Sequence, residues 1–228
     1  MLSSGAEVAA RVSYYNADGS VGELCGNATL CSASWCVSHG YAPSAGFLLE
    51  TDAGRVAARH MAQPSVRLAP VADLRADWAP SREDPAEARL GFARVGVPHV
   101  VVLVDDVDGI DVGGRGAELR RDPRLGSAGA NANFVSPAAG EAGVRFRMRT
   151  FERGVEAETL ACGTGAAATA ALLSAWGMTS GPVVQLETRS GRWLEVELDG
   201  TSGPSGIVPV LTGEGRVVFE GRIGDLGD

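Results

Sequence analysis

The chain of 228 residues contains no lysine, and all 20 of its basic residues are arginine. A pyridoxal-phosphate enzyme needs a lysine to form its Schiff base, so that chemistry is excluded. A P-loop needs a Gly-Lys-Ser/Thr sequence, which is therefore absent, and no Gly-x-Gly-x-x-Gly motif follows an expected strand. The missing residues thus remove two large classes of cofactor and nucleotide chemistry.

Other features are scarce. The net charge of −8 argues against a nucleic-acid partner, which would require a basic face. No stretch approaches the roughly 20 apolar residues of a membrane span. The first residues, MLSSGAEVAARV, lack a basic start followed by an apolar core, so we expect no secretion signal. These observations favour a protein of the cytoplasm that binds neither nucleic acid nor membrane.

Cysteine and histidine are also few. Four cysteines in a chain of this size do not make a disulfide framework, and none of the three histidines has zinc-ligand spacing with them. We expect no metal site. Cys31 and Cys36 fall within an expected helix and are interpreted as packing residues, whereas Cys25 and Cys162 each stand directly before a glycine and a helical segment.

The chain repeats itself at an offset of 137 residues, which carries Cys25-Gly26 onto Cys162-Gly163. The same offset carries Gly40 onto Gly177, Leu49-Glu50-Thr51 onto Leu186-Glu187-Thr188, and Gly54-Arg55 onto Gly191-Arg192. Upstream, Tyr14 falls on Phe151. Such self-similarity predicts two like units with a cleft between them, a common ligand position.

Each unit has the same local pattern. An alternating strand (11–17 or 144–152) precedes the cysteine, and a helix follows over about 26–38 or 164–176. Gly40 and Gly177 stand where a helix C-terminus favours a left-handed residue. A hairpin turning at Ala53-Gly54 or Ser190-Gly191 comes next. The Pro/Ala/Asp-rich stretch 70–88 is interpreted as the linker between the units.

A cysteine at a helix start has two interpretations. It can be a small buried hydrophobe, or the unpaired amides around it can favour its thiolate and attract an anion. Its identical place in both units favours chemistry, because two cysteines would then face one another across the cleft. Two opposed acid/base groups suit the removal of a proton from one face of a carbon and its return to the other. The pattern predicts racemisation or epimerisation without a cofactor.

Four stretches resemble the diaminopimelate epimerase family: YYNADGSVGELCGN (14–27), VGVPHVV (95–101), GANANFV (129–135) and ERGVEAETLACGTGA (152–166). The resemblance implies an α+β fold of two pseudo-symmetric domains, each a mostly antiparallel sheet wrapped around a central helix. It implies domains over 1–87 and 88–212, with a last strand at about 213–223 within the returning segment 213–228. It also implies a homodimer acting on a small amino acid in lysine and peptidoglycan synthesis.

The resemblance also implies roles for particular residues. Cys25 and Cys162 would be the catalytic acid/bases, and the amides of Gly26-Asn27 and Gly163-Thr164 would hold the substrate α-carboxylate. Glu152 would contact the α-amino group, and Arg153 would pair with the distal carboxylate. The remaining expected positions are Asn16 and Asn131 at the distal amino-acid end, and His99 close to the cysteine pair.

Departures from the family pattern keep alternatives open. Val97 stands where the family usually has Asn, and Ala28 and Leu30 replace the usual Gly and Arg. Family sequences also begin about fifty residues earlier with a segment supplying a strand, so we expect an exposed sheet edge and a looser first domain. A racemase of another amino acid, or a degenerate binding protein, therefore remains an alternative.

Bland interpretations of single residues also stay open. Asn16 could serve only a turn, Glu152-Arg153 could be a surface ion pair, and His99 could merely start a strand.

Overall fold

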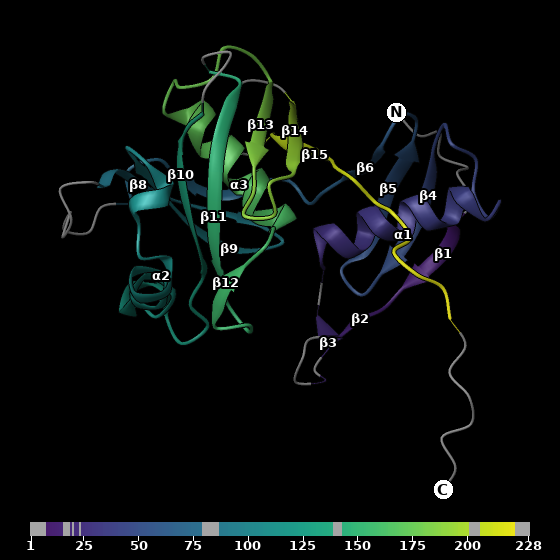
Figure 1. Cartoon of the computed structure of the whole chain (residues 1–228), viewed down its shortest axis with the longest axis horizontal. Coiled ribbons are helices and arrows are strands. Elements are labelled where there is room, and N and C mark those ends of the chain that lie inside the picture. Colours follow the sequence, from purple (N-terminus) through teal and green to yellow (C-terminus); the bar gives the residue numbers. More distant parts are fainter. Residues whose placement is uncertain are drawn as a thin grey trace, which may run out of the picture.

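The computed structural model describes residues 8–15, 19, 21–22, 24–78, 87–138, 143–200 and 206–221. Most of its strands join into one long sheet in the order β1-β4-β5-β6-β15-β14-β13-β11-β10-β9-β8-β7, with β12 paired to β11. The sheet curls into two lobes, each around a helix, as Figure 1 shows. Among the described residues, none of the helices has the length and apolar character that a membrane crossing requires.

The first lobe surrounds helix α1 (Gly26–Ser38). Buried Leu30, Ala33 and Cys36 recur every three residues along α1, so one stripe of the helix packs on the sheet. The helix ends before Gly40, whose φ of 75° is left-handed as the sequence predicts. Its strands are β1 (Val8–Val12), β4 (Phe47–Thr51), β5 (Gly54–His60) and β6 (Pro64–Arg67), and a separate hairpin is formed by β2 (Tyr14–Tyr15) and β3 (Val21–Gly22).

The second lobe encloses helix α3 (Gly163–Ala175), in which every residue from Gly163 to Leu173 is buried. Its run of alanines lets strands approach closely on several sides. The strands are β7 (Ala72–Arg75), β8 (Glu87–Val95), β9 (Val97–Val104), β10 (Asn131–Pro137), β11 (Arg145–Glu152), β12 (Ala157–Thr159), β13 (Val183–Glu187), β14 (Trp193–Asp199) and β15 (Val208–Thr212). Helix α2 (Val112–Arg120) and the short 3-10 helices η1 (Val107–Gly109) and η2 (Pro123–Leu125) cover the outer face.

The expected repeat is visible in the backbone. Each lobe has the order cysteine, helix, left-handed glycine and hairpin, with Gly54 and Gly191 at positive φ in the two turns. The predicted α+β class with mostly antiparallel strands is confirmed. Three pairings are parallel: β1 with β4, β9 with β10, and β11 with β13. The lobes are joined by antiparallel pairing of β15 with β6.

The stretch interpreted as a linker is partly folded into the sheet. Ala72–Arg75 form β7, which pairs with β8, so the prediction of a linker over all of 70–88 is wrong. The ring of Trp78 is buried against Phe92, with centroids 5.9 Å apart, and this contact holds the stretch on the second lobe. Residues 79–86 lie outside the described ranges.

The strand expected at about 213–223 is not found in residues 213–221. This segment instead leaves β15 and crosses α1 of the first lobe, as the yellow trace in Figure 1 shows. The hydroxyl of Ser34 on α1 donates to the Gly215 carbonyl at 2.7 Å, and Glu220 lies 3.9 Å from His39. The Gly213 N–H still donates to the Pro64 carbonyl of β6 at 3.3 Å, and beyond it the segment contacts α1. The expected strand of residues 11–17 is also interrupted, since β1 and β2 are separated at Ser13.

The second lobe depends on a buried ion pair between sheet and helix. Glu87 of β8 is 4% exposed and accepts two hydrogen bonds from Arg115 of α2, at 2.6 and 3.0 Å. We predict that Arg115→Leu lowers the free energy of unfolding by about 3–5 kcal/mol, because an uncompensated carboxylate stays buried. Urea unfolding checks this. Glu118→Gln removes only the exposed partner of Arg115, so a cost of about 1 kcal/mol or less is expected; equal losses in both variants would contradict the prediction.

Candidate active site

The N-termini of α1 and α3 meet at the junction of the lobes. A Cβ atom added to Gly26 would lie 3.2 Å from Gly163 Cα, and one added to Gly163 would lie 3.2 Å from Gly26 Cα. The Asn27 amide donates to the Ala161 carbonyl at 2.9 Å, which ties the start of one helix to the residue before Cys162. Glycine at both positions is therefore required for this close approach.

Both helices leave their first amides available. Cys25 and Cys162 are the N-cap residues, both with extended backbone. Within the described ranges, no side-chain hydrogen bond from either N-cap residue caps its helix, and no acidic residue lies in either first turn. The free N–H groups and the helix dipoles point at the same region, so this junction is suited to bind an anion.

A cavity of about 480 Å³ opens at this junction. It brings together most of the residues that the sequence predicts, from both lobes: Cys25, Gly26, Asn27, Asn131, Glu152, Arg153, Cys162, Gly163 and Thr164. Val97 also lines it. Asn16 lies outside the described residues. The roles of these residues stay predictions.

Strand register explains how one wall of the cavity becomes polar. Asn131 of β10 pairs with His99 of β9, and Asn133 pairs with Thr150 of β11. Paired residues share a face of a sheet, and so do residues two apart along a strand. The alternation in Asn131-Ala132-Asn133 therefore places both amides on the face toward α3 and alanine on the other.

His99 lies behind this wall and does not line the cavity. Asn133 Nδ2 donates to the Val100 carbonyl at 3.0 Å and lies 3.3 Å from His99 Nδ1, while its Oδ1 accepts from Thr150 at 3.0 Å. Because the amide nitrogen can only donate, His99 Nδ1 accepts and the ring proton is on Nε2. Among the described residues, His99 Nε2 has no hydrogen-bond partner.

The imidazole of His99 is neutral. Burial, and to a smaller extent the charges of the Arg153 and Arg94 guanidinium groups, lower its pKa to about 3. His99 therefore adds no positive charge beside the cysteines; an influence on them through its dipole stays a prediction.

His99 makes stability depend on pH. An unfolded chain protonates histidine near pH 6.5, whereas folded His99 does so only near pH 3, so acid favours unfolding between these values. From pH 7 to pH 5, we predict that the wild type loses about 2 kcal/mol more stability than His99→Gln. Urea unfolding at both pH values checks this. Equal losses would show that His99 accepts a proton in the folded protein.

Cys162 is only 7% exposed, and its Sγ lies 3.7 Å from the Thr164 hydroxyl. Burial raises the pKa of its thiol first, and the Glu152 carboxylate raises it further, both by charge and through a hydrogen bond. The Gly165 amide and the Thr164 hydroxyl act in the opposite direction. The thiol form is thus favoured here.

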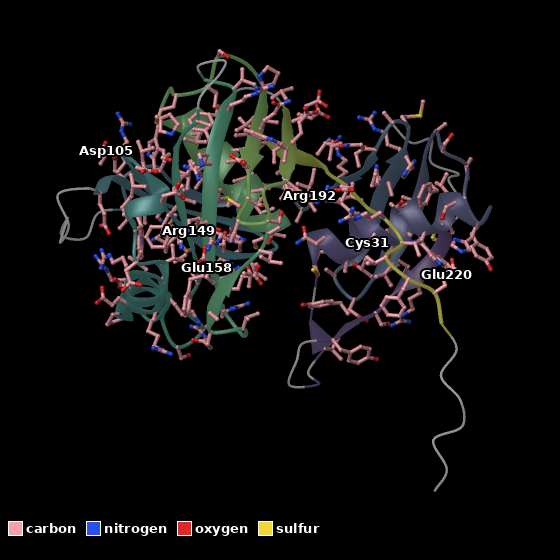
Figure 2. All side chains as sticks on the ribbon, in the orientation of Figure 1. Cys31, Asp105, Arg149, Glu158, Arg192 and Glu220 are labelled. Atoms are coloured by element: carbon pink, nitrogen blue, oxygen red, sulfur yellow. The ribbon has the colours of Figure 1, made fainter. Side chains whose placement is uncertain are left out.

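Glu152 is the last residue of β11 and Arg153 follows it, and both make hydrogen bonds with neighbouring polar groups. The Thr159 hydroxyl donates to Glu152 Oε1 at 2.8 Å, and the Arg153 backbone N–H donates to Asn131 Oδ1 at 2.8 Å. Within the described part of the chain, no carboxylate pairs with the Arg153 guanidinium, so the alternative interpretation of Glu152-Arg153 as a surface ion pair is not supported. By contrast, Arg149 of β11 is bound by Glu158 at 2.7 Å, and Figure 2 shows both.

A second groove of about 490 Å³ lies on the outer face of β13 and β14. Its charged groups are engaged by their neighbours: Arg145 stacks on Trp193, Arg192 pairs with Glu214, and Glu195 accepts from Gln185. This groove contains no nucleophile. Among the described residues, no cluster of His, Cys, Asp and Glu could hold a metal ion.

Sequence reasoning missed several residues of the site. Tyr14 and Thr159 line the cavity, and Asn133 and Thr150 support it from behind. Two signals were present. At the offset of 137 residues, Tyr14, which has a hydroxyl group, corresponds to Phe151, which has none. The period-two pattern of polar residues around Asn131 extends to Asn133.

Comparison with known proteins gives a consistent result. A family model described as diaminopimelate epimerase matches residues 91–218. A diaminopimelate epimerase of Gemmatimonas aurantiaca is 46% identical over 225 residues, covering 96% of this chain and 80% of that one.

Solved structures share the fold at lower identity. The Bacillus anthracis phenazine biosynthesis protein of the PhzF family superposes with a TM-score of 0.71 at 16% identity, over 90% of this chain and 77% of that one. A probable proline racemase from Agrobacterium radiobacter K84 gives 0.66 at 18% identity, over 94% and 71%. From the family model and the 46% identical relative, the chain belongs to the diaminopimelate epimerase family.

Proposed function

We propose that this chain is a diaminopimelate epimerase, an isomerase that interconverts LL- and meso-diaminopimelate without a cofactor. The observation that carries the proposal is the meeting of two uncapped helix starts, each with a cysteine, in one cavity. An amino acid whose α-carboxylate accepts from both sets of amides would have its α-carbon between the two sulfur atoms.

The reaction moves two protons. One cysteine, as thiolate, removes the α-proton, and the electron pair stays on the α-carbon and its carboxylate. The other cysteine, as thiol, gives its proton to the opposite face, which inverts the carbon and leaves the two cysteines with exchanged protonation states. Which cysteine removes the proton depends on the isomer bound. The converging amides stabilise the negative charge that develops toward the carboxylate.

The remaining groups would set which amino acid binds. Glu152 would accept from the α-ammonium group. The Arg153 guanidinium, which pairs with no carboxylate of the described residues, would bind a distal carboxylate through two hydrogen bonds. Asn131, together with Asn16, would recognise the distal amino-acid end. We further propose that the enzyme acts in lysine and peptidoglycan precursor synthesis in the cytoplasm, as a homodimer.

A second candidate keeps the chemistry and changes the substrate. Val97 lines the cavity with an apolar side chain, at the position where the family resemblance implies a polar contact to the distal amino-acid group. An amino acid without a distal ammonium group would not need a polar contact at this position. An epimerase or racemase of such an amino acid is therefore the alternative.

Isomer analysis tests the proposal. The reduced protein is incubated with LL-diaminopimelate, and the isomers are separated by chiral chromatography over time. Formation of the meso isomer, and of LL from meso, is expected. Turnover of another amino acid and none of diaminopimelate would support the alternative, and no turnover of any would overturn the epimerase proposal.

A further inference from the structure

Gly165 lies in the first turn of α3, and two other residues fill the space where its side chain would be. A Cβ atom added to Gly165 would clash with Asn133 Oδ1, and it would lie 3.3 Å from Asn133 Cγ and 3.2 Å from Cys162 Sγ. Gly165 belongs to the turn that the Ala166 N–H closes by donating to the Cys162 carbonyl at 2.9 Å. The Asn133 amide and the Cys162 thiol therefore meet at one turn of the helix.

The first unit has a side chain at the equivalent position. The offset of 137 residues carries Ala28 of α1 onto Gly165, so a Cβ is present at that place in α1. The backbone of Gly165 is not left-handed, so its conformation would accept an alanine. What excludes a side chain in α3 is space, and Asn133 occupies that space.

The Asn133 amide has a fixed orientation, because groups on the two strands beside β10 bind it. Its Nδ2 faces the Val100 carbonyl of β9, which can only accept, and lies 3.3 Å from His99 Nδ1. Its Oδ1 accepts from the Thr150 hydroxyl of β11 and is the atom that meets Gly165. Asn133 is fully buried and does not line the cavity. It thus connects the start of α3 to three strands from behind the cavity wall.

We propose that Asn133 is a positioning residue of the active site, whose amide occupies the side-chain space of Gly165 and thereby fixes the first turn of α3 and the Cys162 thiol. A buried amide whose hydrogen bonds are satisfied is rigid, so it gives this turn a firm surface to pack against. The kinetic part of this inference rests on the proposed function; the packing of Asn133 against Gly165 does not.

Urea unfolding of Asn133→Ala, Gly165→Ala and the double variant tests the packing. In the wild-type background, Gly165→Ala is expected to raise the unfolding equilibrium constant about tenfold or more, because the new Cβ meets the Asn133 amide. In the Asn133→Ala background, the same change should leave the constant unchanged or lower it by up to about fivefold, because the space is open and alanine favours a helix over glycine. Equal effects of Gly165→Ala in both backgrounds would overturn the proposal.

The values of kcat and KM give the second readout, at a temperature where every variant is folded. Asn133→Ala should lower kcat about tenfold and change KM by less than about twofold, because the residues that line the cavity are all kept. Thr150→Val removes the donor to Asn133 Oδ1 at nearly constant volume and should lower kcat about fivefold. This milder variant carries the test if Asn133→Ala does not fold.

Thr169→Val is the matched control, since Thr169 is a fully buried residue of α3 whose hydroxyl donates to Met148 Sδ at 3.4 Å. It should lower stability and leave kcat unchanged. Unfolding that depends on both Asn133 and Gly165, in a protein that turns over no amino acid, would overturn the proposed function and support the packing. A wild-type kcat in Asn133→Ala and Thr150→Val, or an equal fall in Thr169→Val, would overturn the positioning role.

Discussion

Replacing either Cys25 or Cys162 by alanine is expected to lower kcat/KM for diaminopimelate by about 10²- to 10⁴-fold. Each cysteine serves one face of the α-carbon, so the loss of one leaves no group to complete the inversion. The two single variants and the double variant should have similar residual rates, because the cysteines act as a unit. Chiral chromatography of timed samples measures the rates.

Cys31→Ala is the matched control, since Cys31 is exposed on the same helix as Cys25. Its kcat/KM should equal that of the wild type. Figure 2 shows Cys31 on α1. Retention of activity in Cys25→Ala or Cys162→Ala, with normal thermal unfolding, would contradict the two-cysteine account.

Gly163→Ala is expected to lower kcat/KM by about a hundredfold or more, since a displacement on the order of 1 Å at a reacting geometry has that effect. The added Cβ would lie 2.7 Å from Leu211 Cδ2 and 3.2 Å from Gly26 Cα. Leu211 is fully buried in a close-packed core and the Gly26 contact is to backbone, so we expect the two helix starts to separate. The amides that converge on the carboxylate would then no longer do so.

Gly181→Ala provides the comparison, because a Cβ there has no heavy atom within 4 Å and the backbone is not left-handed. Its activity should be unchanged. If Gly163→Ala retained wild-type kcat/KM, the approach of the two helix starts would not matter for the reaction.

Local signals in the sequence predicted the helices and turns of the site well. A thiol, a glycine and a run of small residues mark the start of α3, and Gly177 ends it at a φ of 69°. These features depend on residues close together in the chain. The repeat then placed Cys25 by analogy with Cys162, and the cavity contains both.

Strand partners could not be predicted in the same way. A period of two shows which face of a strand is buried but not which strand lies beside it or in which direction. The parallel pairing of β9 with β10 is therefore invisible in the sequence. This pairing places His99 beside Asn131. The contribution of Asn133 was missed for the same reason, because the sequence does not show which strands are neighbours.

The linker prediction was wrong over Ala72–Arg75 for a related reason. Proline, alanine and aspartate are poor strand formers locally. Burial of Trp78 against Phe92 and pairing with β8 override that preference. Residues 213–221 show the reverse case, because the strand that the family resemblance implies there is not formed and the segment contacts the side of α1.

The most direct test of the central claim follows the first turnovers of LL-diaminopimelate in D2O by NMR and mass spectrometry. Two separate cysteines predict that the meso product carries solvent deuterium at the inverted α-carbon, while the remaining LL substrate keeps its hydrogen, because abstraction and delivery use different thiols. Meso product that retains the original hydrogen would contradict this account, since a single base would then have carried the proton from one face to the other.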